Sequence, residues 1–390
     1  MGTRVGIVGT GFVSRHFCLS ITKHAGYAVS RVLTRRAVNS CTEFPARDAL
    51  TNSVDELADN CDVVFECTGD PVHAAEVVDK VMQAGLPVVT MNSEFHVTAG
   101  SYFVDKGLIT EAEGDQPGAQ AVLKEDLVEL GFKPLVFGNM KAFLNHNPTP
   151  EEMAYWGKKQ GFSLSMVTSF TDGTKIQVEQ AFVANGLDAD IARTGLLGPE
   201  MDDLRAAADI LADHARATGG PISDYMLSRK APHGVFAVVT HDPEQQTLLS
   251  NLKLGDGPNY VLEKKYILVA LEAMKTIRRV VEQGRILLNN STYPRISVAT
   301  VAKRKLTRGT RIDVGIGSFD VRGVAVRIVE NADHVPIGLV QNAVIRRTVE
   351  PEQILTFDDV ELPENLALSA WLSTKQKVMQ RAASARTSAA

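Results

Sequence analysis

Short apolar runs alternate with longer amphipathic stretches through the first third of the chain. Runs rich in valine and isoleucine, with no polar face, are typical of parallel strands buried on both sides. Amphipathic stretches between such runs are typical of helices, and the alternation predicts a doubly wound α/β domain. The expected strands are 4–8, 27–33, 62–66, 86–91, 108–110 and 134–137, and the expected helices are 12–24, 73–84 and 118–130.

The pattern changes after residues 145–150. Beyond that point the amphipathic periodicity predicts helices, with one apolar strand between them, which indicates an α+β domain for substrate binding and oligomerisation. The expected helices are 173–185, 201–217 and 264–283, and the expected strand is 234–240.

The last hundred residues contain two stretches that echo each other, VAKRKLTRGTRID and VIRRTVEPEQILTFDDVEL. Each has a basic pair, a turn, and an apolar residue that leads to an aspartate. The second resembles the SAF or β-clip module, which implies short strands joined by tight turns. Such a module serves either as a lid over the substrate or as a packing and oligomerisation element, and we favour the second. The expected domains are 1–150, 151–295 and 296–375, followed by a disordered tail at 376–390.

The composition is that of an ordinary globular protein, with 44% hydrophobic and 22% charged residues. A net charge of -5 argues against a nucleic-acid-binding surface. No apolar run reaches the roughly 18 residues of a membrane span. The four cysteines have no metal-site spacing, so we expect reduced, buried thiols. These features predict a cytoplasmic protein that acts on a small molecule, without nucleic-acid or membrane partners. Because α+β substrate domains commonly contain the oligomer interface, we expect a homodimer or homotetramer.

The first expected strand runs directly into a glycine turn, in the segment RVGIVGTGFVSRHF. Gly9 suits the tight turn, and Gly11 lets the backbone approach a pyrophosphate bound at the amides of Phe12 and Val13. Ser14 stands where the third glycine of the dinucleotide-binding pattern is usual. The pattern is weak by itself, but its place between a first strand and a helix favours a dinucleotide over FMN or a mononucleotide.

The end of the second expected strand indicates which dinucleotide is bound. An acidic residue there usually accepts the adenosine ribose hydroxyl, but this strand ends in Thr34, Arg35 and Arg36. Guanidinium groups bind a 2′-phosphate through charge-assisted hydrogen bonds, whereas a carboxylate repels it. The sequence therefore predicts NADP(H), the alternative being that the two arginines are a solvated surface pair.

The ends of the later strands contain further polar residues. Because the carboxyl ends of parallel strands lie at one edge of a sheet, the segments ECTGDP, MNSEFHVTAG and EGDQPG are expected to line the ligand cleft. His96 and Asp115 also have structural interpretations, as a buried histidine and a helix cap. The residues expected to contact the cofactor there are Cys67, Thr68, Gly69 and Asn92.

The helix at 173–185 contains the best catalytic candidates. Asp172, Lys175 and Glu179 are three and four residues apart and therefore share one helix face. Their structural alternatives are an N-cap and a surface ion pair, but apolar neighbours favour a buried helix. Lys141, just past an expected strand, is a second candidate ammonium group.

Hydride transfer to a carbonyl requires a cation or an acid that neutralises the developing alkoxide. Lys175 or Lys141 can supply it. Asp115, Asp172 and Glu179, with Glu94, can hold substrate hydroxyls or bind Mg²⁺ or Mn²⁺. A phosphate on the substrate can be bound by Lys141, Lys175 and Arg229.

The segments VGIVGTGFV, DVVFECTG and VVTMN resemble the nucleotide domain of homoserine dehydrogenases. In that family a lysine follows the asparagine and transfers the proton, whereas Ser93 stands here. The segments EGDQP, SFTDGTK and EPEQILTFDDV resemble the predicted homoserine dehydrogenases that carry a SAF domain, also called a β-clip. This group includes deoxyxylulose-phosphate reductoisomerase-like enzymes of isoprenoid biosynthesis.

Together these features predict an NADP(H)-dependent oxidoreductase that reduces the carbonyl of a polyhydroxylated or phosphorylated metabolite. The resemblance implies a deoxyxylulose-phosphate reductoisomerase-like activity within this class. A homoserine dehydrogenase is the first alternative, and a protein that senses NADP(H) without turnover is the second.

Overall fold

The computed structural model describes residues 2–230 and 233–389. The chain forms two compact units, each built from segments that are distant in sequence. The first unit contains the segment up to Gly118 together with Ile267–Thr292 and Asn365–Thr374, and the second contains Ala119–Tyr266, Tyr293–Glu364 and the segment from Lys375. This division differs from the three consecutive domains expected from the sequence, because two late segments pack within the first unit.

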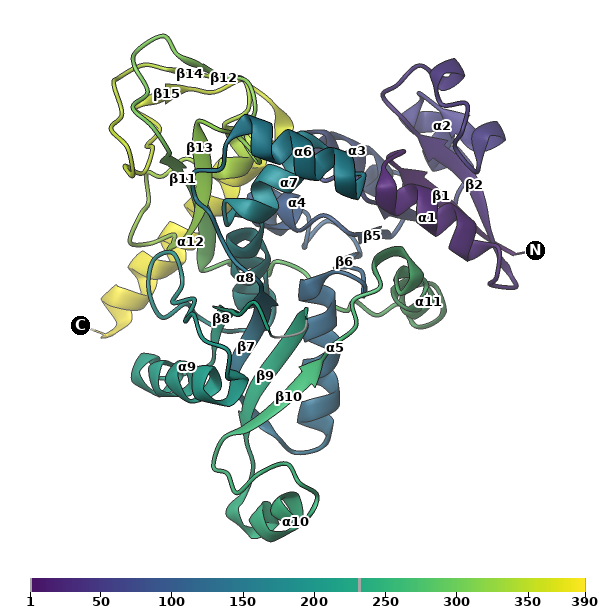
Figure 1. The fold of residues 1–390 in the computed structure, drawn as a ribbon. Helices are drawn as coiled ribbons and strands as arrows, with labels where there is room; N and C mark the ends of the chain where they lie inside the picture. The colour runs from purple at the N-terminus through teal and green to yellow at the C-terminus, as the bar shows by residue number, and fades with distance from the viewer. Residues whose placement is uncertain (1, 231–232, 390) are drawn as a thin grey trace. The chain divides into compact units, whose positions relative to one another are not determined.

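The first unit is built on a six-stranded parallel sheet with the order β3-β2-β1-β4-β5-β6. This is the strand order of dinucleotide-binding Rossmann folds, so the expected doubly wound fold is confirmed (Figure 1). The strands are β1 (Thr3–Val8), β2 (Tyr27–Leu33), β3 (Leu50–Thr51), β4 (Val63–Glu66), β5 (Val88–Thr90) and β6 (Ile109–Glu111). The helices are α1 (Phe12–Ile21), α2 (Val54–Asp59), α3 (Pro71–Gln83), α4 (Ser93–Thr98) and α11 (Ala273–Gln283).

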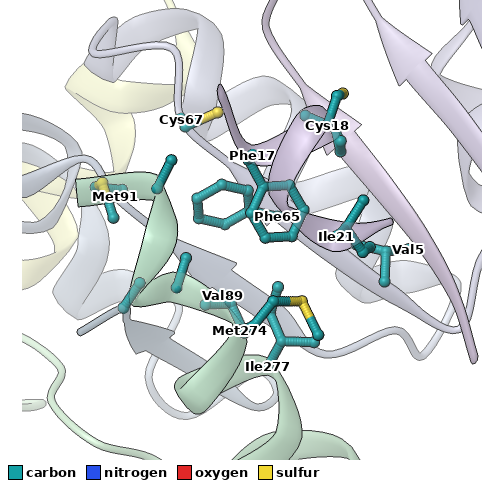
Figure 2. Packing of buried hydrophobic residues seen from close by; sticks show 14 of the residues in the cluster. Val5, Phe17, Cys18, Ile21, Phe65, Cys67, Val89, Met91, Met274 and Ile277 are labelled. Carbon is teal, nitrogen blue, oxygen red and sulfur yellow. The ribbon is translucent and has the colours of Figure 1, made fainter. Parts of the chain in front are cut away.

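The core of the first unit lies between the sheet and helices α1 and α11 (Figure 2). The rings of Phe17 and Phe65 are 4.6 Å apart, and Met274 and Ile277 of α11 are buried in the same cluster. The apolar face of α11 therefore completes the Rossmann core, although more than 150 residues separate it from the last strand of that sheet. The single helix expected over 264–283 is wrong, because residues up to Lys264 belong to a strand and a turn precedes α11.

The second unit contains a four-stranded sheet with the order β10-β9-β7-β8, in which only β7 and β8 run parallel. Alternate residues of β9 face opposite sides: Phe236 packs with α9, and Ala237 packs with Leu127 of α5. The strand expected at 134–137 is part of β7 and pairs here, not in the first sheet. The strands are β7 (Lys133–Lys141), β8 (Ile222–Leu227), β9 (Gly234–Thr240) and β10 (Tyr260–Lys264). The helices are α5 (Gln116–Glu129), α6 (Pro150–Gln160), α7 (Leu164–Thr171), α8 (Thr174–Gly186), α9 (Leu204–Thr218) and α10 (Gln246–Asn251).

The C-terminal region is rich in short antiparallel strands, as expected. β11 (Ile296–Ala302) pairs with β13 (Val321–Arg327), and β14 (Ala343–Ile345) lies between β12 (Arg311–Ile312) and β15 (Val360–Glu361). The two echoing stretches of the sequence pair with each other, through β12 and β14 and through a bridge between Leu306 and Val349. The resemblance of this region to a SAF domain stays a prediction.

The end of the chain forms a helix rather than the expected disordered tail. Helix α12 spans Leu366–Ala389. Its later residues are rich in alanine, lysine, arginine and glutamine, which have high helix propensity. Val378 is buried, and the guanidinium of Arg381 lies 4.5 Å from the ring centroid of Tyr293. Over the described residues, no helix has the length and apolar character that crossing a membrane requires.

Candidate active site

The turn after β1 is built around Gly9 and Gly11. Gly9 has a φ of +111°, and a Cβ at this position would lie 3.3 Å from Thr68 Cγ2. Gly11 is the N-cap of α1 and provides no side-chain hydrogen bond, and a Cβ there would contact nothing within 4 Å. The amides of Phe12 and Val13 therefore begin a helix whose cap position has no side chain, which is the arrangement that binds a pyrophosphate.

Ser14 occupies the position of the third glycine and is completely buried. Its hydroxyl donates a hydrogen bond to the carbonyl of Gly11 at 3.0 Å. A small residue is needed because this turn of α1 packs against the sheet, and the hydroxyl group is satisfied locally. The departure from the glycine pattern therefore leaves the turn intact.

A cavity of about 320 Å³ lies at the end of β2. The Arg36 guanidinium donates to the carbonyl and hydroxyl oxygens of Thr10, both at 2.6 Å, and the Arg35 guanidinium donates to Asp70 at 2.8 Å. Burial and the nearby charge of Arg35 lower the pKa of His73. None of the described residues that line the cavity is acidic; they are Leu33, Thr34, Arg35, Arg36, Ala37, Asn52, Val54 and His73.

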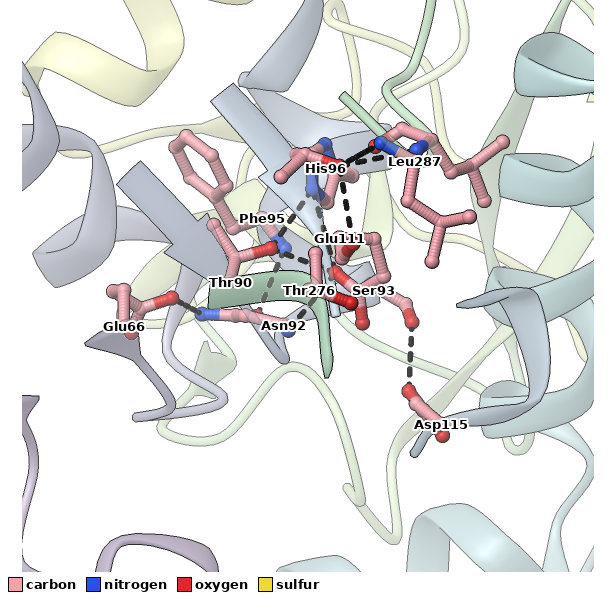
Figure 3. Close-up of polar contacts among 12 residues, drawn as sticks. Glu66, Thr90, Asn92, Ser93, Phe95, His96, Glu111, Asp115, Thr276 and Leu287 are labelled. Carbon is pink, nitrogen blue, oxygen red and sulfur yellow. Dashed lines mark hydrogen bonds and ion pairs between the residues drawn. The ribbon is translucent and has the colours of Figure 1, made fainter. Parts of the chain in front are cut away.

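A buried polar cluster connects the ends of β4 and β5 (Figure 3). One carboxylate oxygen of Glu66 accepts hydrogen bonds from the amide and hydroxyl of Thr68, at 2.8 and 2.5 Å, and the other accepts one from Asn92 at 2.9 Å. Burial raises the pKa of Glu66 to about 7. The cluster fixes the loop that contains Cys67 and Gly69, and Gly69 has a φ of +68°. The sequence placed Glu66 in a segment that lines the cleft but gave it no role of its own, although an acid in a buried strand is unusual enough to signal one.

A second buried cluster lies one strand further along the sheet. The Thr90 hydroxyl lies 2.7 Å from Glu111 Oε2 and 2.8 Å from His96 Nε2. Burial lowers the pKa of His96 to about 3, so its imidazole is neutral at physiological pH. This burial supports the structural role that the sequence favours for His96.

Asp115 lies at the start of α5, where the sequence places a helix cap. Its carboxylate accepts hydrogen bonds from the Gln116 amide at 2.9 Å and from the Ser93 hydroxyl at 3.0 Å (Figure 3). Ser93 therefore contacts a carboxylate at the position where homoserine dehydrogenases have a lysine. Glu94 follows it in α4 and is buried.

In the second unit, two lysines lie beside one buried carboxylate. Glu179 of α8 is 3.4 Å from the ammonium nitrogen of Lys141 and 4.0 Å from that of Lys175. Asn139 of β7 donates a hydrogen bond to Glu179 at 2.9 Å. The Glu179 side chain is 1% exposed and that of Lys175 is 13% exposed, so the alternative of a surface ion pair is wrong.

Helix α8 is buried because its polar side chains bond to neighbouring backbone groups. The amides of Gly323 and Ala325 in β13 donate to Thr174 and Gln177, at 2.9 and 2.8 Å. The side chain of Asn185 both donates to and accepts from the backbone of β11. The C-terminal strands therefore fix the position of the helix that contains Lys175 and Glu179, which is the packing role that we favoured for this region (Figure 1).

Asp172 pairs with a lysine that the sequence did not indicate. Its carboxylate accepts a hydrogen bond from Lys303 at 2.6 Å and another from the amide of Thr174, the first residue of α8, at 2.8 Å. The expected N-cap role is wrong by one residue, because Gly173 is the N-cap of α8 and Asp172 is the C-cap of α7. Lys303 donates in addition to the carbonyl of Ser318 at 2.5 Å. Burial lowers the pKa of Lys303, and the charge of Asp172 partly opposes this.

Among the described residues, the side chains expected to bind a metal ion do not gather at one site. Within residues 2–230 and 233–389, no group of three or more histidine, cysteine, aspartate or glutamate side chains is arranged to hold a metal ion. Arg229 is exposed just beyond β8. All four cysteines are buried free thiols, as expected.

Comparison with known proteins finds similarity to oxidoreductases. Residues 114–273, about two fifths of the chain, match the family model described as "Oxidoreductase DRL, catalytic domain". The matched residues contain β7 and α8. No curated protein sequence matches the chain.

Solved structures of other oxidoreductases share a distant likeness. A UDP-N-acetylglucosamine 3-dehydrogenase from Acidithiobacillus ferrooxidans is 12% identical over 74% of this chain and 92% of its own, with a TM-score of 0.43. An oxidoreductase from Thermotoga maritima is 13% identical over 75% and 92%, with a TM-score of 0.38. A dehydrogenase from Clostridium difficile is 11% identical over 72% and 91%, with a TM-score of 0.40. Similarity at this level says nothing of this chain's substrate.

Proposed function

We propose that the protein is an NADP(H)-dependent oxidoreductase that reduces the carbonyl group of a small polyhydroxylated or phosphorylated metabolite. The observation that carries this proposal is the cavity at the end of β2, where Arg35 and Arg36 lie beside a helix start without a side-chain cap. A dinucleotide with a 2′-phosphate needs both features, whereas NAD(H) needs only the second.

The residues present fit the cofactor. The amides at the start of α1 would hold the pyrophosphate, and the Thr34 hydroxyl and the two guanidiniums would hold the ribose and its phosphate. When bound, the nicotinamide supplies or accepts a hydride. Cys67, Thr68, Gly69 and Asn92 lie at the ends of β4 and β5, and the buried Glu66 fixes their loop.

The lysines beside Glu179 are proposed to act on the substrate oxygen. A carbonyl that gains a hydride becomes an alkoxide, and an ammonium group lowers the barrier by neutralising it or by giving it a proton. Glu179 holds both ammonium groups near one point, so either Lys141 or Lys175 can serve. Asp115 and Glu94 are proposed to contact substrate hydroxyls. Asp172, which pairs with the buried Lys303, is proposed instead to position the start of α8.

The resemblance of the sequence makes deoxyxylulose-phosphate reductoisomerase the first activity to test. Homoserine dehydrogenase is the second activity to test, and it is disfavoured because Ser93 stands where that family has its proton-transferring lysine. The sensing of NADP(H) without turnover is the third, and the partly buried lysine pair argues against it, since a sensor has no need of groups that neutralise an alkoxide.

The proposal is tested by the loss of NADPH absorbance with deoxyxylulose phosphate, other ketose phosphates and aspartate semialdehyde, each with and without Mg²⁺ or Mn²⁺. We expect turnover of one of them. Lys141→Met and Lys175→Met should each be measured, and at least one should lower kcat by roughly a hundredfold. Lys133→Met is the matched control, because this exposed lysine pairs only at the surface with Asp242. Tight NADPH binding without turnover of any compound contradicts the proposal and favours the sensor.

A further inference from the structure

The outer face of α6 is exposed and apolar at its centre. Met153 and Gly157 are the buried residues of this helix. At about 100° per residue, Tyr155 lies opposite these two positions, in the middle of the outer face. Tyr155 is 60% exposed and Trp156 is 37% exposed, and their rings contact each other edge to face at 5.3 Å. An exposed aromatic pair of this kind is typical of an interaction surface.

The charges on α6 are symmetric about Tyr155. Glu151 and Lys159 lie four residues before and after it, and Glu152 and Lys158 lie three residues before and after it. All four are exposed, and none forms an ion pair with another of the described residues, although the ammonium nitrogen of Lys159 lies 4.7 Å from the ring centroid of Trp156. Acidic residues at the start and basic residues at the end of a helix also suit its dipole. The dipole does not account for the exposed rings between them.

We propose that this face of α6 binds the same face of a second copy of the chain. In an antiparallel pair of helices related by a two-fold axis near Tyr155, Glu151 meets Lys159 of the second copy, and Glu152 meets its Lys158. The interface is then self-complementary, as the isologous interface of a two-fold dimer must be. The aromatic rings occupy its centre and the charges its rim, which is the usual anatomy of such a surface.

Helix α7 extends the surface. α6 and α7 form a helical hairpin so tight that a Cβ on Gly157 would lie 3.1 Å from the carbonyl oxygen of Phe162 (Figure 1). Leu164, Met166 and Phe170 of α7 are exposed. A stable dimer buries about 800 Å² on each partner, which is more than one face of an 11-residue helix provides. Under this proposal, the exposed apolar residues of α7 supply the remainder.

The mass of the full-length protein in solution tests this proposal, measured by analytical ultracentrifugation at several concentrations and at low salt. The wild type is expected to dimerise. The variants E151K/E152K and K158E/K159E should each associate at least tenfold more weakly, because like charges then meet at both ends of the helix pair. An equimolar mixture of the two variants should regain the wild-type affinity, since one chain is then basic and the other acidic at every facing position.

Two further variants separate this interface from general effects of charge and folding. Lys253→Glu, at an exposed site outside α6, should dimerise as the wild type does, and circular dichroism at low temperature should give the same helix content for all variants. Tyr155→Ala should weaken the dimer without changing its fold. A monomeric wild type overturns the proposal, and so do charge variants that dimerise as well as the wild type. A mixture that stays monomeric overturns the antiparallel arrangement.

Discussion

The ammonium nitrogen of Lys303 lies 2.6 Å from Asp172 Oδ2, and the two residues are 131 positions apart in the sequence. Both side chains are almost completely buried. The pair connects the end of β11 to the start of α8, which contains the lysine and carboxylate proposed to act on the substrate. The C-terminal strands are therefore part of what positions the candidate site.

Replacement of Lys303 by methionine is expected to destabilise the protein by about 3–5 kcal/mol, because it leaves the carboxylate of Asp172 buried without its cation. Urea unfolding measures this loss. The double variant Lys303→Met with Asp172→Asn should recover part of the lost stability, since no unpaired carboxylate is then buried. If the losses in unfolding free energy of the two single variants add in the double variant, the two residues do not stabilise each other.

Glu179→Gln is expected to lower kcat by about tenfold or more, because the amide keeps a hydrogen bond with Asn139 but no longer attracts the two ammonium groups. NADPH affinity should be unchanged. Steady-state kinetics on the substrate found in the panel measures the effect, and Glu263→Gln, at an exposed position of β10, is the control. Equal kcat values for Glu179→Gln and the control count against the role of this cluster.

Glu66 makes stability depend on pH in a direction opposite to that of most carboxylates. Its pKa in the folded protein, about 7, is above its ordinary value of 4.5. Between these values the folded protein keeps a proton that the unfolded chain releases. The contribution of Glu66 to stability is therefore full below pH 4.5 and is lost as the pH rises through 7.

Glu66→Gln should remove this dependence. The difference in unfolding free energy between wild type and variant is expected to change by roughly 2–3 kcal/mol between pH 4.5 and 8. Other groups titrate in both proteins, so the comparison isolates Glu66. A difference that stays constant over this range contradicts the raised pKa.

The sequence predicted the parts of the fold that depend on local pattern. The strand Tyr27–Leu33, the glycine turn at Gly9 and the buried helix α8 follow from periodicity and turn chemistry, and each is close to its expected place. The partner of a strand is not a local property. β7 has the apolar sequence of a strand for either sheet, and its pairing with β9 was therefore not predictable from its own residues.

The candidate site also contains some residues that local sequence predicts and others that depend on distant contacts. The residues at strand ends, such as Thr68 and Asn92, could be predicted because the ends of parallel strands define a shared edge. Lys303 could not, since nothing in the local sequence VAKRK distinguishes it from its neighbours, and its partner is distant in the chain. The pairing of α8 with β11 and β13 depends on contacts of the same kind.

The central claim is that the end of β2 binds a 2′-phosphate, and titration of the protein's fluorescence with NADPH and NADH tests it most directly. Arg47→Asp, at an exposed arginine that does not line the cavity, is the control for Arg35→Asp. We predict that the wild type binds NADPH at least about tenfold more tightly than NADH, a difference of about 1.4 kcal/mol. Arg35→Asp should remove this preference and leave NADH binding unchanged, whereas equal affinity of the wild type for both nucleotides would contradict the account.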